Sequence, residues 1–329
     1  MFDRSDLTFH RLSRFAVGVT ALGLIAAPLA AQEAEYEAPA EEAMMDAPEP
    51  GIGDNLWGEF TLDFTSSYFF FGIPQENQGI ISQNSLVLGL TLPELDLGGE
   101  SITTDVYAGT FNSLHFDNPS NEAATQAGIA WWYEGDVFVG AALGLPAGFT
   151  LDVSYWSVNG PSIATQFDQE FDIFLFYDDA PLWEEVGFEG FALAPYLAFI
   201  IETDGGADGL GSDGEPGKLF LAGVEPSFTI IESEDYPVTL SIPLEVGIEI
   251  DDYYENAAGV DDSFGYFQAG ASLSTPLSFI PKEYGAWEGH VTGNVIFLGD
   301  ATQEIGESDF GVLDGDTHGW VSTGVSLSF

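Results

Sequence analysis

Carboxylate side chains recur at alternate positions in the apolar-rich segments of this chain. In LSIPLEVGIEI, which ends at Ile250, Glu245 and Glu249 share one face of an extended strand, and the large apolar residues take the other. The same alternation assigns these acids to a polar inner face: Glu59, Asp63, Asp105, Asp152, Glu170, Asp172, Glu225, Glu245, Glu249 and Glu288. Carboxylates around a common water-filled space concentrate cations and repel anions. The pattern therefore predicts a pore lined by these acids, with a preference for cations.

Basic side chains are too scarce to neutralise such a face. The 329 residues include 54 Asp and Glu but only 5 Lys and Arg, which gives a formal net charge of −49. Beyond residue 31 only Lys218 and Lys282 remain, although His290 and His318 could join the acidic face. A chain this acidic is a poor partner for nucleic acid. We predict small cationic or neutral solutes as the molecules that it handles.

The chain offers little for catalysis. It has no cysteine, so disulfides and thiolate metal ligands are excluded. The sequence FNSLHF places Ser113 and His115 on one face of a strand, as a lipid hydrolase in a barrel wall would need. Such a pair is common by chance, however, and no third residue is evident to orient the histidine. We predict no catalytic residue and no enzyme, and rank a lipid hydrolase as a distant third reading.

Acidic residues also crowd three connecting segments, 203–217, 251–263 and 299–317. Hard cations such as Ca²⁺ bind several oxygen ligands in loops of this kind. The spacing of these acids does not match that of a calcium-binding loop. We therefore predict no defined metal site and no cofactor, and leave open weak divalent-cation binding by charge alone.

A period of two in hydrophobicity dominates the chain from Trp57 onward and predicts long strands. Twelve segments show it, at about 58–72, 80–92, 102–113, 135–145, 149–159, 166–178, 191–202, 218–231, 237–250, 264–277, 285–298 and 318–329. Membrane-spanning strands need about 9–11 residues, whereas strands of soluble proteins average about 5–6. An even number of long strands predicts an all-β fold, a transmembrane antiparallel up-and-down β-barrel of 12 strands. A soluble β-sandwich is the alternative.

The connections and the aromatic residues fit the same fold. If both termini lie inside, the three longest connections fall on the outer side, as in outer-membrane barrels. We also expect aromatic girdles at the two membrane interfaces. Their predicted members are Trp57 and Trp287 at the inner ends of strands, and Tyr68, Tyr133, Trp156 and Tyr253 at the outer ends.

The N-terminal region predicts export. A basic start, a short apolar run and small residues before Gln32 indicate a signal peptide over 1–31. The Ala-, Pro- and Glu-rich stretch 32–56 follows and predicts a disordered acidic periplasmic tail. The barrel would then occupy 57–329 as one domain.

Two short motifs carry a resemblance to known proteins. The ending VSTGVSLSF, with Thr323, Val325, Leu327 and Phe329, resembles the C-terminal strand by which the barrel-assembly machinery recognises its substrates. SSYFFFGIPQENQGIISQ, which begins at Ser66, resembles the opening of the TorF-like family of outer-membrane porins. The matching positions are Ser67, Tyr68, Gly72, Ile73, Gln75 and Gln83, and Phe71 replaces the family's arginine. The resemblance implies a small porin-type barrel.

The sequence predicts, in sum, a porin-like barrel in the lipid of the cell outer membrane, which gives passive, cation-preferring diffusion of small solutes. The alternative is a non-conducting structural or surface-interaction barrel with acidic, divalent-binding outer loops. Twelve strands leave both open, because barrels of about 8 strands fill with side chains and barrels of about 16 hold an aqueous channel.

Overall fold

The computed structural model describes residues 55–98, 101–116, 131–162, 165–206, 216–233, 236–255, 262–309 and 315–329. The predicted signal peptide and the acidic tail up to residue 54 lie outside these ranges. The strands are β1 (Leu56–Thr65), β2 (Tyr68–Phe70), β3 (Ile73–Glu76), β4 (Ile81–Asp96), β5 (Ser101–His115), β6 (Trp132–Gly144), β7 (Phe149–Gly160), β8 (Thr165–Tyr177), β9 (Phe191–Ala192), β10 (Tyr196–Gly205), β11 (Lys218–Val224), β12 (Ser227–Ile231), β13 (Val238–Ser241), β14 (Leu244–Asp251), β15 (Phe264–Pro276), β16 (Ala286–Leu298) and β17 (Thr317–Ser328). The helices include α2 (Ala180–Glu185), α3 (Asp300–Glu304) and the π-helical turn η5 (Ile305–Asp309).

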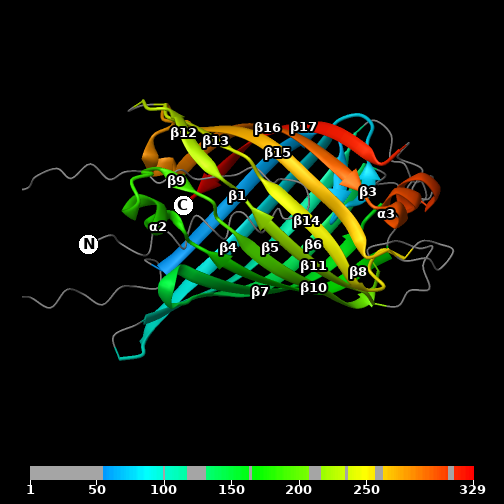
Figure 1. The fold of residues 1–329 in the computed structure, drawn as a ribbon, viewed down its shortest axis with the longest axis horizontal. Coiled ribbons are helices and arrows are strands. Elements are labelled where there is room, and N and C mark those ends of the chain that lie inside the picture. The colour runs from blue at the N-terminus through cyan, green and yellow to red at the C-terminus, as the bar shows by residue number, and fades with distance from the viewer. Residues whose placement is uncertain are drawn as a thin grey trace, which may run out of the picture.

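The strands form a closed antiparallel barrel of 12 strands, as predicted. Each strand pairs with its neighbours in sequence, and β9–β10, β11–β12 and β13–β14 each form one interrupted strand (Figure 1). The last strand β17 closes the barrel by pairing with β1, and Gly58 and Phe329 exchange two backbone hydrogen bonds of 2.9 and 3.0 Å. Closure removes both free edges of the sheet. Both termini of the barrel lie at one end, which we call the inner end; the other is the outer end.

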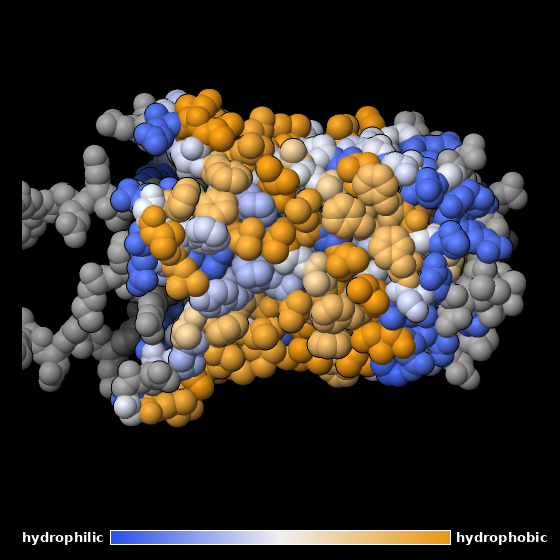
Figure 2. Space-filling view, viewed as in Figure 1, coloured by the Kyte–Doolittle hydropathy of each residue, from blue (hydrophilic) through white to orange (hydrophobic). Residues whose placement is uncertain are grey.

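Side chains alternate between the two faces of the barrel wall. Along β7, Thr150, Asp152 and Ser154 are buried inside, whereas Phe149 and Val153 face outward and are exposed. The outward side chains form an apolar band around the waist of the visible face, with hydrophilic residues gathered at the outer end (Figure 2). The barrel thus turns its apolar face outward and its polar face inward, the reverse of a soluble protein.

Prolines interrupt three of the predicted strands. Segment 191–202 divides into β9 and β10 at Pro195, segment 218–231 into β11 and β12 at Pro226, and segment 237–250 into β13 and β14 at Pro243. Proline lacks the N–H that a central strand must donate, so the hydrogen-bonded ladder stops there. The long inner connection 179–190 contains the short helix α2.

The predicted strand 58–72 is wrong in its second half. Strand β1 ends at Thr65, and the chain then turns into the barrel and forms the β2–β3 hairpin, a separate two-stranded sheet. The aromatic girdle is also wrong for most of its predicted members. Side chains that the girdle places at the interface are at most 8% exposed and lie inside the barrel: Trp57, Tyr68, Tyr133, Trp156 and Tyr253.

No helix in the described part of the chain is long and apolar enough to span a membrane.

We expect the apolar band to lie in a bilayer, and Val139→Lys tests this. Val139 points outward from the middle of β6 and is 56% exposed. A lysine there would cost about 2–4 kcal/mol of unfolding free energy at the bilayer midplane. Unfolding by urea in lipid vesicles, followed by tryptophan fluorescence, measures the loss. Val186→Lys, at a 65% exposed apolar position after α2, should cost almost nothing. Equal stability of the two variants would contradict a membrane position for the band.

Candidate functional site: the acidic lumen and its hairpin

The structure places all of the acids predicted to line a pore on the inner face of the barrel. The buried members are Glu59, Asp63, Asp105, Asp152, Glu170, Asp172, Glu225 and Glu249, and the half-buried members are Glu245 and Glu288. They come from strands all round the barrel, because period-two alternation turns every second residue inward. Their convergence on one lumen follows from the closed sheet, and their role in conduction stays a prediction.

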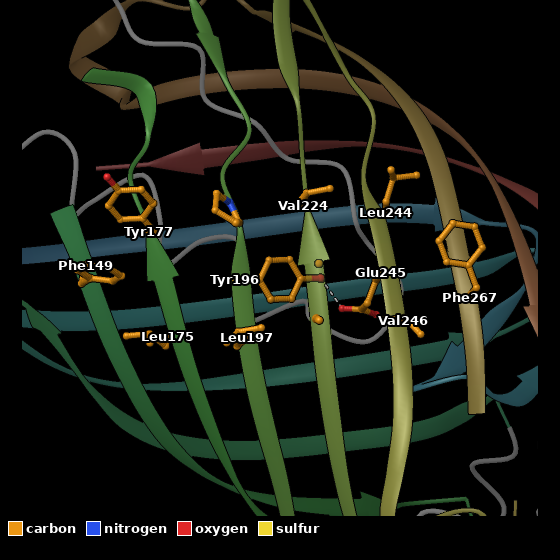
Figure 3. Close-up of a pocket in the computed structure, with 13 residues that line it drawn as sticks. Phe149, Leu175, Tyr177, Tyr196, Leu197, Val224, Leu244, Glu245, Val246 and Phe267 are labelled. Carbon is orange, nitrogen blue, oxygen red and sulfur yellow. Dashed lines mark hydrogen bonds between the residues drawn. The ribbon is translucent and has the colours of Figure 1, made fainter. Parts of the chain in front are cut away.

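Aromatic side chains, and not basic ones, hold several of these carboxylates. The Tyr107 hydroxyl donates to Asp152 at 2.8 Å, and the Tyr266 hydroxyl donates to Glu245 at 2.5 Å. Glu245 also accepts a hydrogen bond from the Tyr196 hydroxyl (Figure 3). The Tyr196 ring lies directly over Gly223, which has no side chain to block it. Hydroxyl donors satisfy a carboxylate without neutralising its charge.

His290 Nε2 lies within hydrogen-bond distance of Asp63 Oδ1, at 2.6 Å. Lys218 pairs with the exposed Asp251, and Lys282 lies exposed in an inner turn. Neither described lysine therefore faces the lumen. The inner face keeps a large excess of acids over bases.

Four further acids face the lumen but were not in the predicted set: Glu134, Asp136, Asp168 and Glu202. All are at most 5% exposed. Asp168 could have been found, because it continues the alternation of Glu170 and Asp172 on the same strand. Glu134 gave no such signal, because it lies just outside the predicted strand 135–145.

The β2–β3 hairpin fills the outer part of the lumen. Its two turn residues have positive φ, 42° at Phe71 and 89° at Gly72. Gly72 is required there, because a Cβ would lie 2.3 Å from the ring of Tyr266. The hairpin side chains are buried, with Tyr68 and Ile73 at 0% exposure. An outer connection of this barrel is therefore folded inward.

Contacts with several walls fix the hairpin in place. Tyr68 donates from its hydroxyl to Glu134 on β6 at 2.7 Å, and the ring of Phe69 lies 4.8 Å from that of Trp320 on β17. At the tip, the Tyr254 hydroxyl donates to the carbonyl oxygen of Phe71 at 2.7 Å. The hairpin thus spans the lumen from β1 to the loop after β14.

Helix α3 and turn η5 cover the hairpin at the outer end and contact β3 (Figure 1). Ala301 of α3 and Ile305 of η5 are buried beneath this cover. Glu307 on the exposed side accepts hydrogen bonds from the Gln303 amide and the Gly315 N–H, which lower its pKa. Because the pKa is lowered, these two hydrogen bonds stabilise α3 and η5 at pH values above the ordinary pKa of glutamate. The stabilisation is lost as the pH falls through the lowered pKa of the folded protein.

The Ser113–His115 pair also lies inside the lumen. Ser113 Oγ is 3.0 Å from His115 Nε2, and Glu76 of the hairpin lies 3.9 Å from His115 Nδ1. The ring of His115 stacks on Tyr133 at 4.3 Å between centroids. Ser113 is 0% exposed and points away from the outer face of the barrel.

An apolar groove of about 540 Å³ marks the outer face near the strand interruptions. Phe149, Leu175, Leu197 and Phe267 are among its lining residues (Figure 3). The groove lies where β11 and β14 part from their prolyl continuations.

Comparison with known proteins yields structural likenesses only. No family model and no curated protein sequence matches the chain. The COG4313 outer membrane channel from Pseudomonas putida F1 is 12% identical, with 88% of this chain and 100% of that one covered and a TM-score of 0.45. The β domain of the Bordetella autotransporter BrkA is 11% identical, with 84% and 99% covered and a TM-score of 0.40. The NanC porin is 9% identical, with 82% of this chain and 98% of that one covered and a TM-score of 0.38.

These likenesses are too distant to carry an argument about function, and the fold rests on the strand pairing itself. The neighbours are outer-membrane barrels, but none of them confirms a TorF-like family. The resemblance drawn from residues 66–83 stays a prediction.

Gly72→Ala tests the packing of the hairpin against Tyr266. The alanine side chain strains the backbone, at a cost of about 1–3 kcal/mol, and overpacks against Tyr266 at a similar cost. The variant should therefore lose at least about 2 kcal/mol of unfolding free energy. Gly98→Ala is the matched control, because Gly98 has φ of 84° but nothing within 4 Å. Urea unfolding in vesicles compares the two variants. Equal losses would show that the hairpin does not pack against Tyr266.

Proposed function

We propose that this protein is an outer-membrane channel for passive, cation-preferring diffusion of small cationic or neutral solutes. The observation that carries the proposal is the inner face, where buried carboxylates come from strands all round the barrel and neither described lysine points inward. The apolar waist supports a position in lipid, and the predicted signal peptide supports export to the cell outer membrane.

Electrostatics gives the proposed channel its preference. Fixed negative charges in a narrow space with low-dielectric walls raise the local concentration of cations and exclude anions. Tyrosine donors keep the carboxylates in place without neutralising them. Selectivity for cations is the expected result.

The structure corresponds to a closed state of the proposed channel, because the hairpin occupies the outer part of the lumen. Conduction requires the hairpin to shift. Its polar contacts with the wall, such as Tyr68 with Glu134 and Tyr133 with Gln75, can exchange with water.

A non-conducting structural barrel is the second candidate, and the same packed hairpin favours it. In that case the acidic outer segments would act as the functional surface and bind divalent cations weakly. Most acids of those segments lie outside the described residues.

The barrel-assembly machinery is a proposed partner through β17. This strand ends beside Phe329, whose side chain is 60% exposed on the outside of the closing seam. An exposed aromatic at a strand end is available for recognition before the seam forms.

We also propose that the protein is not an enzyme. Ser113 and His115 are at most 1% exposed and face the lumen, so lipid on the outer face of the barrel cannot reach them. Ser113→Ala should therefore leave the rate of phospholipid hydrolysis by purified protein at the background level of the native protein. A hydrolysis rate that falls with the substitution would overturn this proposal.

Replacing both Glu245 and Glu249 by glutamine tests the proposed selectivity. In a planar bilayer under a KCl gradient, the native protein should give a reversal potential shifted toward that of K⁺, and the double variant should shift it toward zero. Glu184→Gln with Glu185→Gln removes two charges from α2, outside the lumen, and should change nothing. An anion-selective native channel would refute the charge argument, and the absence of current steps would favour the structural barrel.

A further inference from the structure

Strand β8 carries three acids in series on its inner face. Asp168, Glu170 and Asp172 occupy successive inward positions and are 0%, 2% and 6% exposed. The strand rise sets the Cα atoms of neighbouring members about 7 Å apart and makes the backbone of the whole row about 13 Å long. We call these three residues the acid row.

Neighbouring strands add like charges to the acid row. Glu202 on β10 is the direct cross-strand partner of Glu170. Asp152 on β7 lies close enough to Asp172 for their charges to interact, and so does Asp136 on β6 to Asp168. Like charges placed opposite each other in a sheet are destabilising. The fold therefore concentrates negative charge here at a cost.

Several carboxylate oxygens of the acid row are buried with no hydrogen-bond partner. They are both oxygens of Asp168, Oε2 of Glu170 and Oδ1 of Asp172. A buried and unsatisfied charged oxygen costs more than a neutral one, so these atoms call for a donor or a cation. The described lysines face away from the lumen, so the balancing positive charge, a proton or a cation, comes from solution.

A single metal ion does not fit this arrangement. Among the described residues, no three His, Asp or Glu side chains converge in a way that could hold one. The acids are spread along a strand instead of around a point. Their geometry suits a ligand whose positive charges are likewise spread along a line.

Aromatic rings continue the inner face of β8 beyond the acid row. Phe174 and Phe176 follow Asp172, and their rings stack at 5.4 Å between centroids. The Tyr196 ring lies 6.2 Å from Phe174. Aromatic faces attract organic cations and also contact alkyl chains. One strip of the lumen thus offers fixed charges followed by an apolar aromatic surface.

We propose that the acid row and the adjoining aromatic rings bind linear polyammonium ions, whose charges are separated by short alkyl spacers. A spacer of about four carbons sets successive nitrogens at nearly the spacing of alternate strand residues. The ammonium groups donate to the unpartnered carboxylate oxygens, and the alkyl segment lies against Phe174. This proposal rests on the proposed cation channel and names its class of solute.

The buried fraction of the inward side chains changes along β8. Exposure rises along β8 from Asp168 at the outer side to Phe174 at 8%, and Glu245 and Tyr196 beyond it are half-buried. The hairpin occupies the opposite, outer end. We therefore expect a linear ligand to enter from the inner end, where the side chains that bury the row must move aside.

Isothermal titration calorimetry of the whole barrel in detergent micelles tests the proposal, with the triamine spermidine as the probe. The native protein should bind spermidine at least tenfold more tightly than n-butylamine or Mg²⁺ at the same ionic strength. The triple variant Asp168→Asn, Glu170→Gln, Asp172→Asn should weaken spermidine at least tenfold. Heat-dependent mobility in gels checks that the variant barrel is folded.

A charge-matched control separates site binding from general attraction. Glu184→Gln, Glu185→Gln and Glu283→Gln remove three exposed acids outside the lumen and should leave the spermidine affinity within twofold. Phe174→Leu should weaken spermidine but leave Mg²⁺ unaffected. Equal binding of Mg²⁺ and spermidine, or full affinity in the folded triple variant, would overturn the proposal.

Binding and conduction are independent readouts. Spermidine binding without any current would support the polyammonium site at the acid row and refute the proposed channel function. Cation-selective current without spermidine binding would support the channel function and refute the polyammonium site.

Discussion

The enclosure of many carboxyl groups on an inner face that neither described lysine reaches is the constraint on which the rest of this structure depends. Charges in a confined, low-dielectric space repel one another strongly, and ion pairs with Lys or Arg would normally offset that repulsion. Here hydroxyl donors take their place, as at Tyr107 and Tyr266, and one histidine pairs with Asp63. These donors hold the carboxyl groups of the inner face in fixed positions, and the proposed cation preference depends on those groups.

The β2–β3 hairpin occupies part of the space that the barrel wall encloses. Its aromatic side chains lie among the acids of the outer lumen, and the positive φ angles at Phe71 and Gly72 let it turn back within the width of the barrel. It packs into the outer end of the lumen, and the acid row on β8 extends from there toward the inner end.

The sequence was sufficient for the barrel and for most of the acidic inner face, because both follow from period-two alternation around a closed sheet. It was not sufficient for the hairpin. Tyr68 to Phe71 is an unbroken aromatic run, which fits a buried strand and an inward loop equally well. The partners that hold it, Glu134, Trp320 and Tyr254, are distant in sequence. The girdle prediction failed for the same reason, because aromatic identity does not tell which face of a strand is buried.

Replacement of residues 68–76 by two glycines tests the central claim most directly. Tyr68 and Glu76 are paired across the hairpin, so a short link can join the flanking residues without distorting β1 or β4. Single-channel recording under a KCl gradient then compares the shortened and native barrels. An acidic lumen closed by the hairpin predicts larger and more frequent current steps in the shortened barrel, with a reversal potential still toward K⁺. Unchanged conductance, or a loss of cation preference, would contradict it.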